Sequence, residues 1–314
     1  MDKERINDNI INIDADNAGQ RFDKFLIRLF PAGGKGFVYK MLRKKRVKLN
    51  GARAGGSEIL AEGDKVTLFI SPETQKELAG KLNSNRKSGT GKDIELHVIY
   101  EDENILVVNK PANCLTHPGL TDAAALRSGE RRLFKPVAVN RLDRNTTGVV
   151  ILAKTLHAAQ ELSRVIRERG MLKLYIAAVN GVVDKPMVLR GMHVKDKTGN
   201  KAGFGDEGKE AVTEIEPVFS DGEVTVLKIK LVTGRSHQIR AHLQSIGKPV
   251  LGDPKYGDAA VNRRFKEKYG VTAQMLHAWR VKFDGLGGRM EYLNGFEVTC
   301  EPDGLLGRIW KGFN

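Results

Sequence analysis

Apolar residues near the amino terminus recur with the spacing of a helix. Five of them fall at the three- and four-residue intervals that place side chains on one helix face: Phe22, Phe25, Leu26, Leu29 and Phe30. A break of Pro, Ala and two Gly follows, and a second helix with a basic outer face is expected from about Gly36. Residues 47–49 then alternate into Asn50-Gly51, which is typical of a hairpin turn, and residues 66–70 have the pattern of a closing strand. The pattern predicts a small unit of two helices and a hairpin.

From residue 94 onward the chain is dominated by short apolar runs rich in β-branched residues. We expect strands at residues 94–98, 105–108, 137–139, 148–153, 172–179, 211–219 and 224–232. Two long helices are predicted among them: Thr155 caps one that ends at Gly170, and the other spans about residues 236–246. Many short strands with few helices indicate an α+β fold around a central mixed or antiparallel sheet.

The two patterned regions are separated by a segment of different composition. Residues 71–93 are rich in Ser, Gly, Asn and Lys and have almost no apolar periodicity, which is typical of a flexible linker. We therefore expect an amino-terminal arm at residues 1–19, a small domain at 20–70, the linker at 71–93 and a large domain at 94–314.

The net charge of the chain indicates the kind of partner that it binds. The chain of 314 residues has a formal charge of +14, and residues 20–70 hold +8 of it, with twelve basic and four acidic residues. The outer face of the predicted second helix and the residues after it carry a run of cations without an acid: Arg43, Lys44, Lys45, Arg46 and Lys48, with Lys40 before them. A merely solvated helix face usually mixes charges of both signs, whereas neutralising phosphates needs cations alone. The run predicts a nucleic-acid-binding domain.

Several classes of protein are not supported by the sequence. Cys114 and Cys300 are too few for a disulfide framework and are far from the spacing of a Cys-x-x-Cys site. The seven histidines form no H-x-x-x-H or H-E-x-x-H pair, so we expect no metal. The first residues lack the apolar core of a signal peptide, and no apolar run approaches the ~20 residues of a membrane helix. We expect a cytoplasmic protein without a membrane partner.

One short motif matches a cofactor signature without its context. Residues 203–208 fit the spacing G-x-G-x-x-G of dinucleotide-binding loops. That motif binds a pyrophosphate only when a strand precedes it and a helix follows, and here no strand is predicted before it and a strand-like run comes after. We interpret the segment as a loop between two strands.

The segment NRLDRNTTGVVILAK contains the first candidate for chemistry. Asp143 lies between Arg141 and Arg144, after one short strand and before a fully apolar one, so we expect it on a loop at a sheet edge. Neighbouring cations favour the charged form of a carboxylate, which suits a nucleophile or a base. On this segment alone, an aspartate in a turn with a surface salt bridge is the better interpretation.

Two further segments supply possible partners for this carboxylate. The two-residue period of a strand places Lys173 and Tyr175 on one face, opposite Leu174. In VTGRSHQIRAHL a strand gives way to a helix whose first-turn amides suit a phosphate, with Arg235 and His237 beside it, and Arg240 follows one turn after His237.

These residues carry a resemblance to a known family. NRLDRNTTG resembles the HRLDxxTSG signature of the RluA-type pseudouridine synthases of large-subunit ribosomal RNA. Six more segments resemble other blocks of that family in the same order: VVNKPANCLTHPG, KLYIAAVNG, GKEAVT, TGRSHQIRAHL, LGDPKYG and LHAWRVKF. Residues 20–70 resemble the αL-type RNA-binding module of the fourth small-subunit ribosomal protein, and the combination is most similar to the RluC and RluD members. Two residues depart from the signature, Asn140 in place of His and Thr147 in place of Ser.

The resemblance implies an α+β pseudouridine synthase domain and a role for each candidate. Asp143 would be the catalytic carboxylate, which either attacks the anomeric carbon of the target uridine or takes the neighbouring ribose proton. Arg240 would pair with Asp143, Tyr175 would stack on the uracil and help remove the proton from its carbon five, and Arg141 would fill the space left by the flipped base. Lys173, Arg235 and His237 would contact phosphates near the site.

The implied reaction rearranges one nucleoside, so it needs no cofactor. The implied partner is ribosomal RNA of the large subunit or its precursor, and we expect a monomer. Three alternatives remain open: a non-catalytic ribosomal RNA-binding factor, a pseudouridine synthase that acts on transfer RNA, and a nucleosidase or glycosidase. The last class usually needs a second carboxylate at a defined distance from the first.

Overall fold

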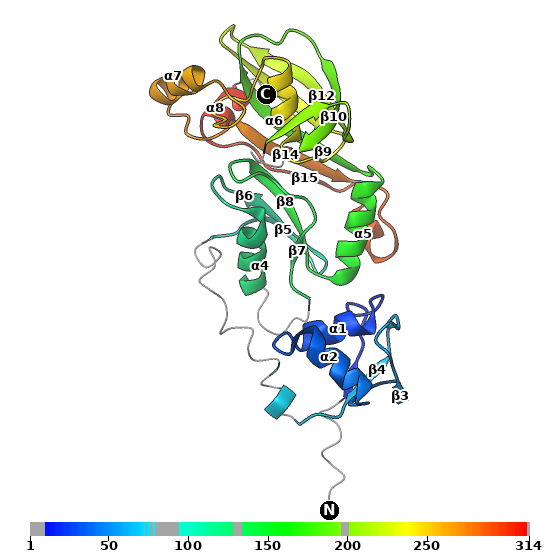
Figure 1. Ribbon diagram of the computed structural model, residues 1–314. Coiled ribbons are helices and arrows are strands. Elements are labelled where there is room, and N and C mark those ends of the chain that lie inside the picture. The colour runs from blue at the N-terminus through cyan, green and yellow to red at the C-terminus, as the bar shows by residue number, and fades with distance from the viewer. Residues whose placement is uncertain are drawn as a thin grey trace, which may run out of the picture.

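The protein, seen in a computed structural model, is described here for residues 10–71, 73–75, 78, 94–127, 134–195 and 201–312. Its small domain contains two helices against a four-stranded antiparallel sheet in the order β1-β4-β2-β3 (Figure 1). The elements are β1 (Ile10–Asn12), α1 (Phe22–Leu29), α2 (Gly34–Arg43), β2 (Val47–Leu49), β3 (Ala52–Arg53) and β4 (Lys65–Leu68). Both predicted helices and the hairpin between residues 47 and 53 are confirmed.

The predicted helix face forms the core of this domain. Phe22, Phe25, Leu26 and Phe30 are each at most 2% exposed, and they pack in one cluster with Val38, Met41 and Leu42 of α2. Burying an aromatic or leucine side chain contributes about 1.5–3 kcal/mol, so this cluster supplies much of the stability of the small domain.

The structure places part of the expected amino-terminal arm in the small domain. Ile10–Asn12 of the expected arm form β1, which pairs with β4, so part of that arm belongs to the small sheet. Residues 1–9 and most of the expected linker at 71–93 lie outside the described residues.

The large domain is built on a mixed sheet of eleven strands among the described residues, with a main path in the order β11-β10-β12-β13-β9-β14-β8-β6-β5. Its strands are β5 (His97–Glu101), β6 (Ile105–Lys110), β7 (Val137–Ala138), β8 (Thr147–Ala153), β9 (Met171–Asn180), β10 (Met187–Lys195), β11 (Ala202–Gly205), β12 (Lys209–Ser220), β13 (Val224–Leu231), β14 (Leu276–Phe283) and β15 (Glu297–Thr299). All pairings are antiparallel except β14 with β8, which is parallel. This confirms the α+β class and the mixed sheet.

Helices cover the large sheet at several points. They are α4 (Thr121–Arg127), α5 (Leu156–Arg167), α6 (Gln238–Ser245), α7 (Ala259–Tyr269) and α8 (Gly304–Lys311), with shorter turns η2 (Thr116–Leu120) and η3 (Gly288–Leu293). The predicted cap of α5 is present, because the Thr155 side chain accepts a hydrogen bond from Ala158 N at 3.1 Å. No helix in the described ranges is long and apolar enough to span a membrane.

Alternation along β9 separates two cores. Tyr175 belongs to the cluster that includes Ile239 and Leu243 of α6, whereas Ile176 belongs to a cluster with Trp279 and Trp310. The predicted two faces of this strand are therefore confirmed, and Tyr175 faces the side on which α6 lies.

The glycine-rich segment at residues 203–208 is not entirely a loop. Gly203, Phe204 and Gly205 belong to β11, an edge strand that pairs with β10, and only the following residues turn toward β12. The loop interpretation was wrong for this half of the motif, because the partner strand β10 was not predicted. A Cβ atom at Gly208 would lie 2.4 Å from the His193 carbonyl oxygen, so that glycine permits close backbone packing.

The parallel pairing of β8 and β14 depends on Gly148. This residue has φ +105°, and a Cβ atom on it would lie 2.2 Å from the carbonyl oxygen of Ala278, its partner on β14. We expect Gly148→Ala to lower the free energy of unfolding by at least about 2 kcal/mol, through both overpacking and backbone strain. The measurement is chemical unfolding of the full chain. Gly203→Ala, with ordinary φ and open space, is the control and should change stability little; equal stability of both variants would contradict this account.

Candidate active site

The Asp143 loop connects β7 to β8. The Asp143 side chain is 25% exposed and lies just before the first residue of β8. The sequence placed this loop at a sheet edge, which was wrong: β8 lies between β14 and β6, inside the sheet. A central strand is held on both sides, so it gives the loop a firmer base than an edge strand would.

Side chains at both ends tie this loop to the sheet. The Asn140 amide donates to Val149 O at 3.0 Å and accepts from Ile151 N at 2.8 Å. It thereby binds backbone groups of β8 just beyond the part of that strand that pairs with β7. The Thr147 hydroxyl lies 2.7 Å from His277 Nδ1 on β14. The two positions that depart from the family signature therefore both fix the ends of the Asp143 loop.

A buried lysine binds the backbone of the Asp143 loop. Lys110 at the end of β6 is fully buried, and its ammonium group donates to the carbonyl oxygens of Pro111, Cys114 and Arg144, each at 2.8 Å. Burial lowers the pKa of Lys110 to about 8. The contact with Arg144 O joins the residue after Asp143 to a different strand.

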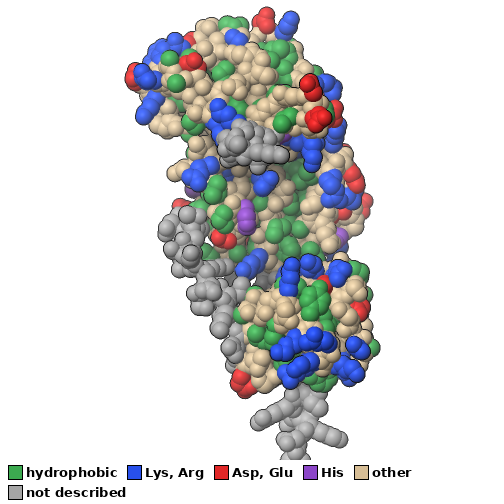
Figure 2. All heavy atoms as spheres, viewed as in Figure 1, with side chains coloured by type: hydrophobic (Ala, Val, Ile, Leu, Met, Phe, Trp, Pro, Cys, Tyr) green, Lys and Arg blue, Asp and Glu red, His purple; other side chains and the backbone are tan. Residues whose placement is uncertain are grey.

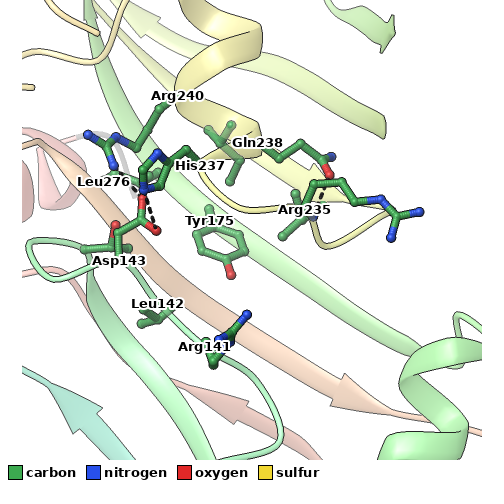
Figure 3. Close-up of a pocket in the computed structure, with 12 residues that line it drawn as sticks. Arg141, Leu142, Asp143, Tyr175, Arg235, His237, Gln238, Arg240 and Leu276 are labelled. Carbon is green, nitrogen blue, oxygen red and sulfur yellow. Dashed lines mark hydrogen bonds and ion pairs between the residues drawn. The ribbon is translucent and has the colours of Figure 1, made fainter. Parts of the chain in front are cut away.

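Arg240 connects Asp143 to a second carboxylate. Its Nη1 donates to Asp143 Oδ2 at 2.7 Å (Figure 3). Its Nε and Nη2 donate to the two oxygens of Asp253 at 2.6 and 2.8 Å. Arg240 is 5% exposed and Asp253 is fully buried. Burial raises the pKa of Asp253, but its bond with Arg240 more than offsets this and keeps that pKa below its usual range. The expected Asp143–Arg240 contact is present, and Asp253 fixes the direction of the arginine.

His237 and Tyr256 complete this cluster. His237 Nε2 lies 3.8 Å from Asp143 Oδ1, and its Nδ1 lies 3.0 Å from the Tyr256 hydroxyl. The guanidinium of Arg240 lies over the Tyr256 ring, 4.8 Å from its centre. His237 was expected to contact a phosphate, but in the structure its side chain is directed at the carboxylate (Figure 3).

A pocket opens beside Asp143. Asp143, Tyr175 and His237 line it, with Arg141 at its rim, and Figure 3 shows the Tyr175 ring between Asp143 and Arg235. Burial and the charge of Asp143 raise the pKa of the Tyr175 phenol, so the phenol keeps its hydrogen at neutral pH. This favours stacking on a base over accepting a proton in the free protein. Arg141 is exposed and lies on the same loop as Asp143.

Two of the weaker candidates lie at the margin of this pocket. The Arg235 side chain lines it but donates to Glu210 O at 3.1 Å, and it points away from Asp143 (Figure 3). Lys173 is two residues before Tyr175 and is not among the residues that line the pocket; burial lowers its pKa. The ammonium nitrogen of Lys173 lies near Gly234, since a Cβ atom built on that glycine would be 3.9 Å from it.

The basic residues of the small domain lie on its surface, far along the chain from the pocket. Lys40, Arg43, Lys44, Lys45 and Arg46 are exposed, and Lys48 lies over the ring of Phe69 at 5.4 Å. Figure 2 shows Lys and Arg side chains gathered on this domain. An exposed aromatic ring among cations is suited to a nucleic acid, because bases stack and phosphates pair.

Sequence reasoning missed Asp253 and Tyr256 as parts of the site. Both lie in the segment LGDPKYG, whose resemblance to the family was noted without a role for either residue. A charged residue two positions after the apolar pair Val250 and Leu251 was the available signal, because a buried carboxylate needs a partner. Among the described residues, no group of three or more His, Cys, Asp or Glu is arranged to hold a metal.

Comparisons with known proteins agree with this arrangement. A family model described as RNA pseudouridylate synthase matches residues 104–245. The chain is 33% identical over 287 residues to ribosomal large subunit pseudouridine synthase C of Escherichia coli strain K12, covering 87% of this chain and 88% of that protein. It is 30% identical over 298 residues to the protein of the same name from Vibrio vulnificus, covering 90% of each.

Solved structures show the same fold. Human RNA pseudouridylate synthase domain containing 4 superposes with a TM-score of 0.54 at 21% identity, over 66% of this chain and 88% of that one. Human RNA pseudouridylate synthase domain containing 1 gives 0.51 at 21% identity, over 70% and 94%. From the sequence blocks, the shared fold and these relatives together, the chain belongs to the RluA family of RNA pseudouridine synthases.

Proposed function

We propose that this enzyme converts specific uridines of large-subunit ribosomal RNA to pseudouridine, with Asp143 as the reacting carboxylate. The observation that carries the proposal is the pair of Asp143 and Arg240, at 2.7 Å, at the floor of a pocket lined by Tyr175. The choice of RNA is supported by two relatives named for the large subunit, each aligned over nearly the whole chain.

The reaction breaks the bond between the ribose and the uracil nitrogen, turns the base and joins it through carbon five, from which a proton then leaves. Arg240 occupies Oδ2 of Asp143, which leaves Oδ1 for the ribose. That oxygen attacks the anomeric carbon or takes the neighbouring ribose proton, and the geometry of the free protein is compatible with both. The charge-assisted bond from Arg240 orients the carboxylate for either step.

The remaining pocket residues handle the flipped base. The Tyr175 ring provides a stacking surface for uracil, and Arg141 on the exposed side of the loop fills the space that the base leaves in the RNA. Lys173 and Arg235, at the margin, contact the flanking phosphates.

The small domain captures RNA through its exposed cations, and the large domain performs the isomerisation. One chain carries all residues of the pocket, so we propose that a monomer is active. We place the enzyme in the cytoplasm, where ribosomes are assembled in bacteria such as the Escherichia and Vibrio species of the relatives.

The first experiment replaces the reacting group. An unmodified large-subunit ribosomal RNA transcript and a transfer RNA pool are incubated with each variant, and pseudouridines are mapped at base resolution. Wild type and Asp184→Asn, a change at an exposed residue of the large domain, should modify the ribosomal transcript. Asp143→Asn should modify nothing while binding the transcript with unchanged affinity. Pseudouridines formed by Asp143→Asn would contradict the catalytic role, and modification of transfer RNA alone would contradict the substrate.

A second variant tests how Arg240 is oriented. In Asp253→Asn the arginine loses a charged partner that binds it through two hydrogen bonds, and misplacement of a reacting group by about 1 Å costs about 100-fold in rate. We therefore expect kcat to fall about 100-fold and the free energy of unfolding to fall by about 3 kcal/mol. Asp258→Ala, which removes only the cap of α7, should lose about 1 kcal/mol of stability and no activity. A fully active Asp253→Asn enzyme would show that Arg240 needs no such support.

A third variant tests the division of labour between domains. Replacing Lys40, Arg43 and Lys44 by Gln should weaken RNA binding and reduce the slope of log affinity against log salt by about 0.7–0.9 for each phosphate that the protein no longer neutralises. The single-turnover rate at saturating enzyme should stay the same. Replacement of Arg167, Arg308 and Lys311, which are exposed on the large domain, provides the equal change in charge. If both triple variants give the same slope, the small domain is not the main RNA-binding surface.

A further inference from the structure

The hydrogen bonds around Tyr256 determine which nitrogen of His237 carries the hydrogen. The Tyr256 hydroxyl is in a side chain only 2% exposed, and it accepts a hydrogen bond from Ala202 N at 2.6 Å. Its own hydrogen has one acceptor within reach in the described part of the chain, His237 Nδ1 at 3.0 Å. A buried hydroxyl donates where it can, so Nδ1 accepts and the neutral imidazole carries its hydrogen on Nε2.

The surroundings of His237 favour this neutral form. Burial lowers the pKa of His237 below its ordinary value of 6.5. The carboxylates of Asp143 and Asp253 act in the opposite direction, and the cations Arg240 and Lys255 add to the lowering. At pH 7 the ring is therefore uncharged, with one donor and one acceptor.

The donor of His237 points at the oxygen of Asp143 that Arg240 leaves free. Nε2 and Oδ1 are 3.8 Å apart, which is too long for a direct hydrogen bond. One oxygen atom placed about 2.9 Å from both would fill this gap, if it accepted from Nε2 and donated to Oδ1. A hydroxyl group can do both, whereas a carbonyl or phosphate oxygen cannot donate.

The backbone conformation of His237 is also unusual. This residue has φ 54° and ψ 20°, a left-handed conformation that is uncommon for residues other than glycine. Such conformations cost of order 1 kcal/mol or more and concentrate at functional sites. Here the conformation directs the ring from the start of α6 toward Asp143.

We propose that His237 is a specificity-determining residue that donates its Nε2 hydrogen to the 2′-hydroxyl of the target ribose, while that hydroxyl donates to Asp143 Oδ1. The 2′-hydroxyl is a donor and an acceptor, it is bonded to the carbon next to the anomeric carbon, and it is the group that distinguishes RNA from DNA. His237 thereby selects ribose at the reacting carbon. This inference rests on the proposed function, since it assigns a contact within the same site.

The first test needs no RNA. Nitrogen-15 NMR of the histidine-labelled full chain at pH 7 reports which ring nitrogen is protonated, and loss of one signal set in His237→Gln assigns His237. We expect hydrogen on Nε2 in the wild type, and a mixture of both forms in Tyr256→Phe, which lacks the donor. Hydrogen on Nδ1 in the wild type would overturn the proposal, whatever the activity of the enzyme.

The second test uses two variants that differ in one donor. His237→Asn tolerates the left-handed backbone and keeps a polar group near Tyr256, but has no donor at the position of Nε2. His237→Gln keeps an N–H donor there. The probe is a synthetic RNA stem-loop around the uridine mapped with wild type, made with ribose or 2′-deoxyribose at that nucleotide. Single-turnover rates against enzyme concentration give the affinity for the ribose RNA, and inhibition gives the affinity for the deoxy RNA.

We expect the ratio of the two affinities, ribose RNA over deoxy RNA, to depend on whether residue 237 has an N–H donor at the position of Nε2. Wild type and His237→Gln should bind the ribose RNA about tenfold more tightly than the deoxy RNA. His237→Asn should show a smaller preference, because only the hydrogen bond from the 2′-hydroxyl to Asp143 remains. A ratio in His237→Asn equal to that of wild type would overturn the proposal, as would a wild type without preference. If wild type modified no uridine at all, the proposed function would fail instead, and the NMR result would still decide the position of the hydrogen.

Discussion

One buried arginine between two carboxylates organises the active site. Arg240 is nearly inaccessible to solvent, and a buried cation without a partner costs several kcal/mol. Asp253 compensates it with two hydrogen bonds, which fixes the plane of the guanidinium and leaves Nη1 for Asp143. The three residues come from α6, the segment that follows α6, and the loop before β8, so the ion pairs also join three parts of the chain. The partly exposed Asp143 carries the remaining negative charge at the pocket.

The sheet gives this cluster its rigidity. The Asp143 loop begins at Asn140, whose side-chain amide bonds to the backbone of β8. It ends at Gly148, which lets β8 and β14 approach each other. Lys110 holds the loop from a third strand. Because these anchors involve β8 itself and its neighbours β6 and β14, several strands of the sheet together place the carboxylate.

The sequence predicted the local parts of this structure and missed the non-local ones. The helices and hairpin of the small domain follow from spacing and turn residues within a few positions, as at Phe22, Phe25 and Asn50. The strands β10, β11 and β14 were not predicted, because their character depends on the neighbouring strands with which they pair in the folded sheet. Asp143 was found through the resemblance of its segment to a family signature, since its neighbours alone favour a surface salt bridge. The roles of Asp253 and the orientation of His237 required the folded arrangement, because no spacing along the chain shows which residues meet Arg240.

The most direct test of the account is a structure of the wild-type enzyme with RNA that carries 5-fluorouridine at the target position. Fluorine replaces the hydrogen that must leave carbon five, so the final proton loss cannot occur and the nucleoside stays in the pocket. The quantity to measure is the position of each Asp143 oxygen. The account predicts Oδ1 in contact with the ribose at its first or second carbon, with Oδ2 still bound to Arg240. An Asp143 turned away from the ribose, or an Arg240 that leaves the aspartate for an RNA phosphate, would contradict it.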